Sequence, residues 1–556
     1  MNDRLKYSLL FAALGALFFI PFLGGVHLFD WDEINFAEIS REMLLLGEYT
    51  RIYINFEPFW EKPPLFFWNQ AAAMYFFGTN EFAARLPNAL IGIATLVVLF
   101  NIGKTLYSTR FGIIWAGVYF GSILPFLYFK SGIIDPYFNF FIFLGIYFFI
   151  LSYWKRDQFE QISLPKSSLS YLFWGGFFIG VGILTKGQVA YLIACLTFFV
   201  YWVYQRLRFY VNVPQFLFFT LAATLVTLGW YGLETWKNGT WFIVEFNKYQ
   251  YRLFSTPDAG HKGFPGYHFV VLLVGCFPAS IFAIRSFFKS KVEEAPFQKD
   301  FRIWMKFLFW AVLILFTIVR SKIVHYSSMC YFPLTFLAAF VIEKIITGEI
   351  AFNRWMRIGL FSIGGLFVFA TIALPFVGMN IDVLKPLFND PFAVANLDAE
   401  VNWTGFEVIP GVFLLVVLIL SIRYLRRREY QRGFIGLFGG TAVFVMLTLI
   451  FYIGRIESYS QRAAIEFYES KIAEDCYIIT HAYKSYAHLF YAKKRPVTNE
   501  ESYSKDWLIS GAADKPVYVV AKIHRTKEME EFPNLKELYR KNGFVFYQRT
   551  DAPVTN

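Results

Sequence analysis

The chain has 556 residues, of which 56% are hydrophobic, 21% aromatic and only 17% charged. Soluble globular proteins carry about 25% charged residues, so this composition excludes a large soluble protein and indicates many membrane spans. The formal net charge of +11 fits basic loops beside a membrane better than a nucleic-acid partner, because no nucleic-acid-binding motif accompanies it.

Apolar segments long enough to cross a bilayer recur along most of the chain. A spanning helix needs about 20 mostly apolar residues, and about 13 segments approach this length. They lie near 7–26, 84–104, 111–129, 137–154, 171–186, 188–205, 214–233, 267–287, 303–320, 326–346, 357–378, 407–424 and 433–454. The first is expected to stay uncleaved, because no small-residue cleavage site follows it. The predicted fold is an all-α polytopic membrane protein.

Lysine and arginine are concentrated in alternate loops between these spans. These loops lie near 104–110, 155–166, 206–208, 285–302, 344–357 and 423–432. All fall on one side of the predicted topology, and the positive-inside rule makes that side cytoplasmic. We therefore expect a cytoplasmic N-terminus in the cytoplasmic (inner) membrane. The loops 27–83 and 234–266, and everything after 455, should lie outside.

The first outer loop begins with a cluster of carboxylates just after the first span. Asp30, Asp32 and Glu33 stand at the membrane boundary, where an ionisable group costs desolvation energy unless it is wet or paired. Such groups indicate a functional site by default. Apolar and charged residues alternate over 33–46, which predicts an amphipathic helix on the membrane surface, with Glu42 solvated.

A second cluster follows in the same loop. Glu61 and Lys62 stand between Pro58 and the pair Pro63-Pro64, which break the chain into a rigid turn. A carboxylate can accept a proton, and a lysine beside it can hold a phosphate. The sequence therefore indicates an enzyme working at the boundary between water and lipid.

Further polar residues stand where later helices leave the membrane on the outer side. They are Asp135, Lys186, Asn247, Lys248, Arg252, His261, Lys262, Arg320, Lys322, His325 and Tyr326. Carboxylates come first in the chain and most cations later, so the folded loops are expected to place an acidic spot beside a basic pocket. No P-loop, dinucleotide-binding turn or nucleophile elbow is present.

The segment after 455 changes character. Residues 476–480 and 516–520 are predicted to form short buried strands, and 483–492 and 534–542 to form helices. We therefore divide the chain into a membrane domain, 1–455, and a small extracytoplasmic α/β domain, 456–556.

Four motifs in these outer segments resemble those of a known family. WDEINFAEISREM (31–43), EKPP (61–64), DPY (135–137) and TKG (185–187) are similar to motifs of the GT-C membrane glycosyltransferases. Within that superfamily, the chain looks most like bacterial lipid A aminoarabinose transferases and protein mannosyltransferase-like proteins. The resemblance implies an inverting transfer on the outer membrane face, from a polyprenyl-phosphate-linked sugar donor to a glycolipid, polysaccharide or protein acceptor.

The resemblance also assigns roles to individual residues. It implies that Asp32 is the catalytic base and that Asp135 is a second important acid. The neighbouring Glu33 is a further catalytic candidate from its place beside Asp32. The implied contacts to the donor phosphate are Lys62, Lys186, Arg252 and Tyr326. Glu61, Asn247 and His261 are candidate substrate contacts. No cofactor is required, and Glu61 is the candidate ligand if a divalent metal takes part.

Two departures limit how far the resemblance reaches. Aminoarabinose transferases tend to have an arginine where Asn35 stands and a histidine near Asn247. The particular sugar and acceptor therefore stay open. The alternative function is a non-catalytic transporter or flippase for the same lipid. It should show ionisable residues at mid-membrane and broken helices in two matching halves, and the sequence shows neither pattern.

Overall fold

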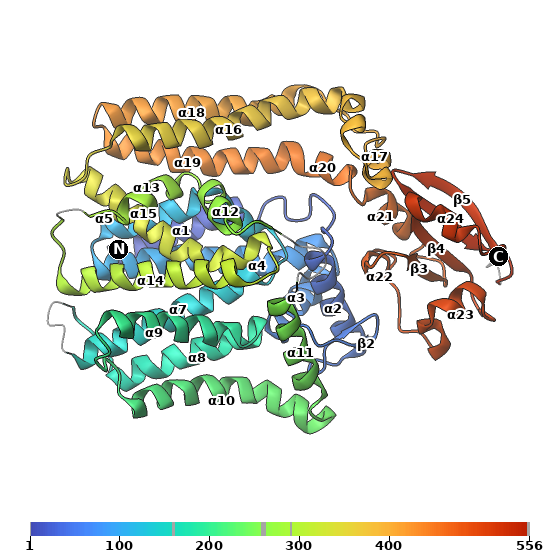
Figure 1. Cartoon of the computed structure of the whole chain (residues 1–556), viewed down its shortest axis with the longest axis horizontal. Coiled ribbons are helices and arrows are strands. Elements are labelled where there is room, and N and C mark those ends of the chain that lie inside the picture. The colour runs from blue at the N-terminus through green and yellow to red at the C-terminus, as the bar shows by residue number, and fades with distance from the viewer. Residues whose placement is uncertain (1, 158–161, 257–262, 290–291, 553–556) are drawn as a thin grey trace.

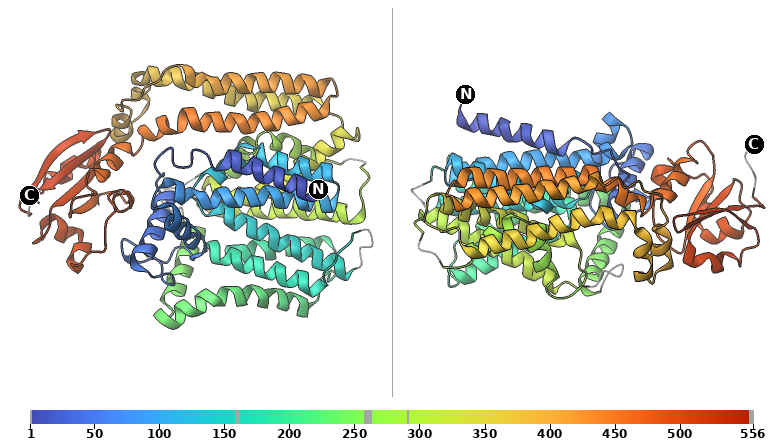
Figure 2. Two further views of the ribbon diagram at one scale, coloured as in Figure 1. Left: turned by 180° about the vertical axis from the view of Figure 1, so that it is seen from behind. Right: turned by 90° about the horizontal axis from the view of Figure 1, so that it is seen from above.

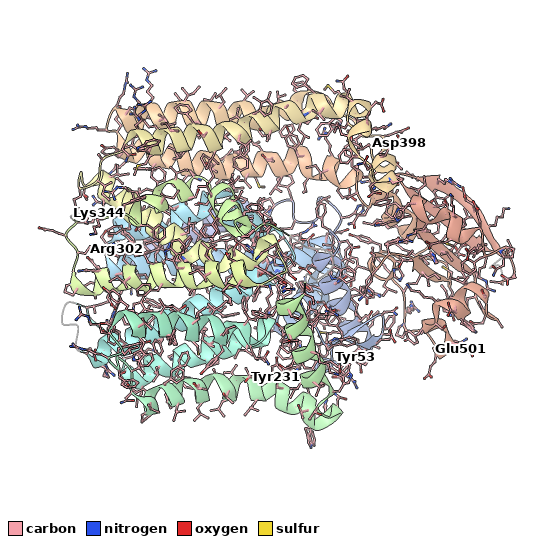
Figure 3. All side chains as sticks on the ribbon, in the orientation of Figure 1. Tyr53, Tyr231, Arg302, Lys344, Asp398 and Glu501 are labelled. Carbon is pink, nitrogen blue, oxygen red and sulfur yellow. The ribbon has the colours of Figure 1, made fainter. Side chains whose placement is uncertain are left out.

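A computed structural model describes residues 2–157, 162–256, 263–289 and 292–552. Long helices run side by side through most of the molecule, and a small sheet-containing domain stands at one end of them (Figures 1, 2 and 3). Short helices of the outer loops lie between the long helices and this domain (Figure 1). The predicted fold class, a polytopic helical membrane protein with a small C-terminal α/β domain, is confirmed.

Nine helical segments in the described part of the chain are long and apolar enough to cross a membrane. They are α4 (Glu81–Leu106), α7 (Asp135–Arg156), α8 (Ser168–Lys186), α10 (Val213–Asn238), α14 (Pro296–Ile318), η3 with α15 (Val324–Cys330, Tyr331–Ile346), α16 (Arg354–Met379), η6 with α18 (Phe406–Val408, Ile409–Arg426) and α19 to α20 (Tyr430–Thr448, Leu449–Ile453, Gly454–Ser458).

The other predicted spans are also helical but shorter or bent. The pair α5 (Thr109–Phe120) and α6–η1 (Ile123–Leu127, Tyr128–Lys130) bends by 78°, and the pair α12 (Tyr267–Gly275) and α13 (Ala279–Ser286) by 117°. Helices α1 (Asp3–Phe19) and α9 (Val189–Tyr204) are shorter. Each predicted span thus corresponds to helix, and the count of about 13 crossings stays a prediction.

The two bends bear on the transporter alternative, because the sequence showed no broken helix. Gly121 and Ser122 separate α5 from α6, and Pro278, which lacks a backbone N–H, precedes α13. None of these three residues lines the large outer cavity described below. The two breaks therefore do not line that cavity in the way that the broken helices of a transporter line its substrate site.

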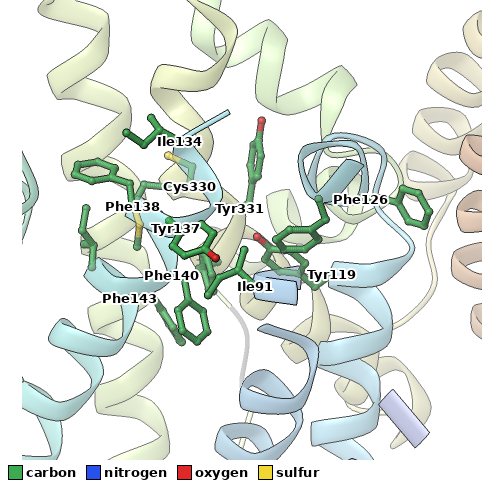
Figure 4. Close-up of a cluster of buried hydrophobic side chains, with 14 of the residues drawn as sticks. Ile91, Tyr119, Phe126, Ile134, Tyr137, Phe138, Phe140, Phe143, Cys330 and Tyr331 are labelled. Carbon is green, nitrogen blue, oxygen red and sulfur yellow. The ribbon is translucent and has the colours of Figure 1, made fainter. Parts of the chain in front are cut away.

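Helix α7 lies at the centre of the bundle. In its most apolar window 89% of the residues are buried within the protein. The aromatic and aliphatic side chains around it form a continuous core, including Tyr137, Phe140 and Phe143 from α7 itself and Tyr331 from α15 (Figure 4). Helix α7 is thus enclosed by the bundle, and its first residue, Asp135, is buried at the end that carries the C-terminal domain.

The first outer loop folds into α2 (Asp32–Leu46), the hairpin β1–β2 (Tyr53–Ile54, Glu57–Pro58) and α3 (Leu65–Phe77). The predicted helix over 33–46 forms, but its assignment to the membrane surface is wrong, because every residue from 33 to 43 is buried. Glu42 is fully buried rather than solvated. Buried charges need partners, and Arg41 supplies one by forming an ion pair with Glu38 at 2.6 Å.

The C-terminal segment contains a four-stranded sheet in the order β3-β4-β6-β5. Strands β3 and β4 are parallel, and the other neighbours are antiparallel. Its helices and strands are α21 (Arg462–Glu469), β3 (Tyr477–His481), α22 (Ala487–Tyr491), α23 (Lys505–Ser510), β4 (Val517–Lys522), α24 (Thr526–Met529), β5 (Leu535–Lys541) and β6 (Phe544–Arg549). The short helix α17 (Pro391–Asn396) lies earlier in the chain, between α16 and α18. The two predicted strands are confirmed, and the predicted helix 483–492 shortens to α22.

The predicted helix over 534–542 is wrong, because this segment is strand β5. It pairs with β6 across the dipeptide Asn542-Gly543, and both of these residues have positive φ. Asn-Gly is the turn that tight antiparallel hairpins favour. The turn signal therefore outweighs the helical pattern of the preceding residues.

Candidate active site

A cavity of about 790 Å³ opens at the end of the bundle that carries the C-terminal domain, between the long helices and the short helices of the 27–83 loop. Its wall includes eight of the predicted site residues, namely Asp32, Glu33, Glu61, Lys62, Asp135, Lys186, Arg252 and Tyr326. The outer loops are thus brought together as expected. Asn247 is not in this wall. It is exposed on α11 (Trp241–Ser255), and its amide donates to the Ile243 carbonyl. His261 lies outside the described residues.

Asp32 is the first residue of α2 and faces His325. The Asp32 Oδ2 lies 3.7 Å from His325 Nε2, and both side chains are half-buried. The charges of Asp135, Lys186 and Lys62 also act on the pKa of His325. It therefore marks the place where the predicted acids and cations meet. The sequence placed His325 in an outer loop but gave no reason to select it.

Asp135 and Lys186 form an ion pair within the cavity wall. Lys186 Nζ lies 2.7 Å from Asp135 Oδ1 and 5.5 Å from the ring centre of Tyr326. The other carboxylate oxygen of Asp135 is buried and has no hydrogen-bond partner among the described residues. Buried polar atoms are usually paired, so this oxygen is available to a donor on a bound substrate. Lys186, in contrast, already has its counter-charge.

Lys62 and Arg252 lie against the same aromatic ring. Lys62 Nζ is 3.3 Å from the hydroxyl of Tyr249 and 4.8 Å from its ring centre, and the Arg252 guanidinium lies 5.2 Å from that ring. No carboxylate in the described segments is within ion-pair distance of Lys62. Two cations positioned by one tyrosine suit a phosphate. The sequence did not indicate Tyr249, which is one of 34 tyrosines and belongs to no motif.

Glu33 is held in a different way. Its carboxylate accepts hydrogen bonds from Arg85 at 3.0 and 2.7 Å and from the backbone N–H groups of Phe29 and Gly132. Burial alone would raise the pKa of Glu33, but the ion pair and the hydrogen bonds lower it below the usual value. A carboxylate with all its acceptor sites used has a positioning role beside Asp32, so the geometry does not support the predicted catalytic role of Glu33.

The buried face of α2 also fixes the turn before Lys62. The backbone N–H groups of Asn55 and Phe56, both at positive φ, donate to Glu42 at 2.7 and 2.9 Å. Burial and the nearby Glu38 carboxylate raise the pKa of Glu42. Glu42 therefore connects the core of α2 to the hairpin that leads into Glu61 and Lys62.

The C-terminal domain closes one side of the cavity. Lys484 lines it together with Asp30. Asp30 keeps an exposed surface, but the surrounding protein displaces much of its water, which raises its pKa to about 6. A hydrogen bond from Ser485 and the charge of Lys522 oppose this increase, and Asp32 adds to it. The sequence did not anticipate this contribution from residues after 455.

Comparisons with known proteins identify the fold. Residues 61–230 match the family model described as dolichyl-phosphate-mannose-protein mannosyltransferase. The structure aligns over 99% of both chains, with a TM-score of 0.76 and 17% identity, with ArnT from Cupriavidus metallidurans bound to undecaprenyl phosphate. The apo state of that protein gives a TM-score of 0.74 at 16% identity over both whole chains. The protein has the GT-C fold.

Relatives of known description support the assignment to the GT-C fold. An undecaprenyl phosphate-alpha-4-amino-4-deoxy-L-arabinose arabinosyl transferase from Wigglesworthia glossinidia brevipalpis is 25% identical over 350 residues, which are 62% of this chain and 59% of the relative. The enzyme of the same description from Edwardsiella ictaluri is 27% identical over 347 residues, which are 61% of this chain and 59% of the relative. The chain thus spans about three fifths of the length of these relatives.

The GT-C cavity of this chain has an apolar half beside its charged half. The apolar residues come from α9, α11, α14 and η3 and from the segments around them, and include Val189, Leu192, Ile193, Leu253, Phe254, Leu315, Phe316, Val319, Ile323 and Met329. Pockets of this kind suit a ligand with a long hydrocarbon part and one polar end.

The described residues do not fit a metal site. Among them, no three histidine, cysteine, aspartate or glutamate side chains are placed to hold an ion together. Glu61 lines the cavity, but a single carboxylate is a poor metal site, since divalent cations in proteins take several oxygen or nitrogen ligands. The function below is therefore argued from the side chains alone.

Proposed function

We propose that this protein is an integral membrane glycosyltransferase. It moves a sugar from a polyprenyl-phosphate-linked donor to a hydroxyl acceptor on the outer face of the cytoplasmic membrane. The observation that carries the proposal is one cavity that combines a half-buried carboxylate, Asp32, two cations, Lys62 and Arg252, and an apolar wall. The likeness to a protein bound to undecaprenyl phosphate supports it.

The donor occupies both halves of the cavity in this proposal. Its isoprenoid chain lies along the apolar wall, and its phosphate lies between Lys62 and Arg252. Cations that are already in place stabilise the negative charge that develops as a phosphate leaves. Lys186 and Tyr326, which lie together in the same cavity, contribute as well, and Asp135 keeps Lys186 in position.

The transfer is a single inverting displacement. Asp32 accepts the proton of the acceptor hydroxyl, whose oxygen forms a bond to the anomeric carbon of the sugar. The bond from that carbon to the phosphate oxygen breaks, and polyprenyl phosphate leaves with the bonding electrons. A positioned carboxylate base contributes about 10²–10⁴ in rate to such a step. The acceptor is a glycolipid, a polysaccharide or a protein.

The release of free polyprenyl phosphate tests the proposal directly. Membranes containing the protein and a polyprenyl-phosphate-linked sugar should release polyprenyl phosphate while the acceptor gains one sugar. Chromatography of the lipid products together with mass spectrometry of the acceptor measures both. A transporter or flippase would move the donor and leave it intact. Donor that crosses the membrane unchanged, with no sugar transferred, would therefore support that alternative and refute ours.

The proposed orientation has a separate test. The six basic loops predict a cytoplasmic N-terminus, with the cavity and the C-terminal domain outside. A reporter enzyme that works only outside the cytoplasm, fused after residue 455, should be active, and a cytoplasm-specific reporter at the same place should be silent. The opposite pair of results would place the cavity in the cytoplasm and contradict an outer active site.

A further inference from the structure

A second cavity, of about 890 Å³, lies between the first turns of α16 and the last turns of α18. The other end of α16 leads toward α17, where Phe392 packs against Phe544 of the sheet domain with ring centres 5.1 Å apart. The cavity lining runs from Arg354 to Ser362 and α16 continues to Met379, so the cavity lies about 30 Å along the helix from that end. Figure 1 shows α16 and α18 side by side along one edge of the bundle. The feature is therefore separate from the candidate active site.

The two helices face this cavity with matching stripes. Each stripe follows the i, i+3, i+4, i+7 spacing that places residues on one face of a helix. The stripes are Arg354, Arg357, Ile358 and Phe361 on α16, and Ile419, Ile422, Arg423 and Arg426 on α18. In both helices the arginines lie at the helix end and the apolar residues lie one to two turns deeper. The cavity is therefore basic at its mouth and apolar further in.

Among the described residues, none of the arginines in this cavity has a carboxylate partner. Arg427 joins the other four in the wall. In the described part of the chain, no carboxylate lies within ion-pair distance of any of the five. The Nε of Arg357 is buried and has no hydrogen-bond partner among the described residues. The N-terminus of α16, with its partial positive charge, adds to the same field.

A basic loop of the ordinary positive-inside kind does not account for this arrangement. Such loops need only place charge on one side of the membrane, and water can solvate each side chain separately. Here five guanidinium groups from two helices converge on one cavity. An anion at its mouth would relieve their mutual repulsion and supply an acceptor for the buried Nε of Arg357.

The apolar half of the cavity favours a lipid as the source of that anion. Ile358, Phe361 and Ile419 line the cavity and are nevertheless 40%, 48% and 50% exposed. A small soluble anion would leave these side chains uncovered. An acyl chain would cover them while its phosphate stays at the helix ends, where arginine binds phosphate oxygens in a bidentate manner.

We infer that this cavity binds the head group of an anionic phospholipid, with the phosphate at the five arginines and an acyl chain along the apolar stripe. Basic pockets between spanning helices suit such head groups. The inference does not depend on the proposed transferase activity.

Native mass spectrometry of the full-length protein tests the inference, using phosphatidylglycerol as the probe and phosphatidylcholine at equal concentration as the reference lipid. The wild type should retain phosphatidylglycerol in preference. The Arg357→Gln/Arg423→Gln variant should bind it about tenfold more weakly or worse, because each arginine near a lipid head group contributes substantially to binding. The Arg357→Lys/Arg423→Lys variant, which keeps the charge, should retain much of the preference.

The matched control is Arg428→Gln/Arg432→Gln. It removes two charges from the same end of the bundle, but neither residue lines the cavity. Equal loss in both glutamine variants would show a general effect of charge and overturn the site.

If the Arg357→Gln/Arg423→Gln variant fails to fold, thermal unfolding of the wild type decides. Stabilisation by phosphatidylglycerol that inorganic phosphate does not reproduce supports the inference, and equal stabilisation by inorganic phosphate refutes a lipid site.

Discussion

Replacing Lys62 by alanine should lower donor use strongly while the protein still inserts and folds. Lys62 contacts Tyr249 at 3.3 Å and has no carboxylate partner among the described residues, so a donor phosphate is its natural counter-charge. Losing a hydrogen bond to a charged group costs about 1.5–3 kcal/mol, which corresponds to roughly 10- to 150-fold in kcat/KM. Steady-state kinetics with a polyprenyl-phosphate-linked sugar measures the loss.

Lys248→Ala is the control for this prediction. Lys248 is exposed on α11, forms an ion pair with Glu245 at 2.6 Å, and does not line the cavity. The substitution removes the same charge close to Tyr249 and should leave kcat/KM nearly unchanged. Equal turnover by the wild type and the Lys62→Ala variant would exclude Lys62 from the phosphate site and leave Arg252 as the main phosphate contact.

The position of the cavity could be predicted because it follows from topology. Helices that leave a membrane on the same side bring their ends to one surface, so Asp32, Lys62 and Asp135 meet although they are far apart in the chain. The spacing of apolar segments and basic loops was enough to expect this. Glu61 and Arg252 line the same wall for the same reason.

The partners of these residues could not be predicted, because a pairing depends on contacts in three dimensions. Arg85 is the first example. It stands in the first turns of the apolar helix α4, and its ion pair with Glu33 spans 52 positions of the chain. The second is the Asp135–Lys186 pair, in which an apparent phosphate ligand already has a carboxylate partner. Sequence shows where charges occur, but burial decides which of them are already neutralised.

Helix α2 shows the same limit for secondary structure. Alternating apolar and charged residues correctly indicated a helix, but the charged face was expected to meet water. Instead, Glu38 and Glu42 are fully buried, where they hold Arg41 and the following hairpin. Hydrophobic periodicity describes a helix whose polar side is solvated, and it cannot recognise a polar side that meets other parts of the protein.

Asp32→Asn should abolish sugar transfer and leave the fold intact. Asparagine has the size of aspartate and can still accept a hydrogen bond, but it cannot take a proton near neutral pH. Asp32 is half-buried and lies 3.7 Å from His325, so the change leaves no buried charge unpaired and should cost little stability. Loss of a general base lowers the rate about 10²–10⁴-fold. Single-turnover transfer by purified protein, with thermal unfolding as the check on folding, measures both effects.

Two neighbouring carboxylates are the controls that decide whether Asp32 is the base. The pKa of Asp30, about 6, suits a proton acceptor, but its carboxylate faces Ser485 and Lys522 of the C-terminal domain. Asp135 is neutralised by Lys186 at 2.7 Å. Asp30→Asn should therefore reduce transfer less than Asp32→Asn does. If Asp32→Asn stays active while one of the other two variants is inactive, that residue is the base. If all three variants stay active, a carboxylate base at this site is wrong, and with it the proposed displacement.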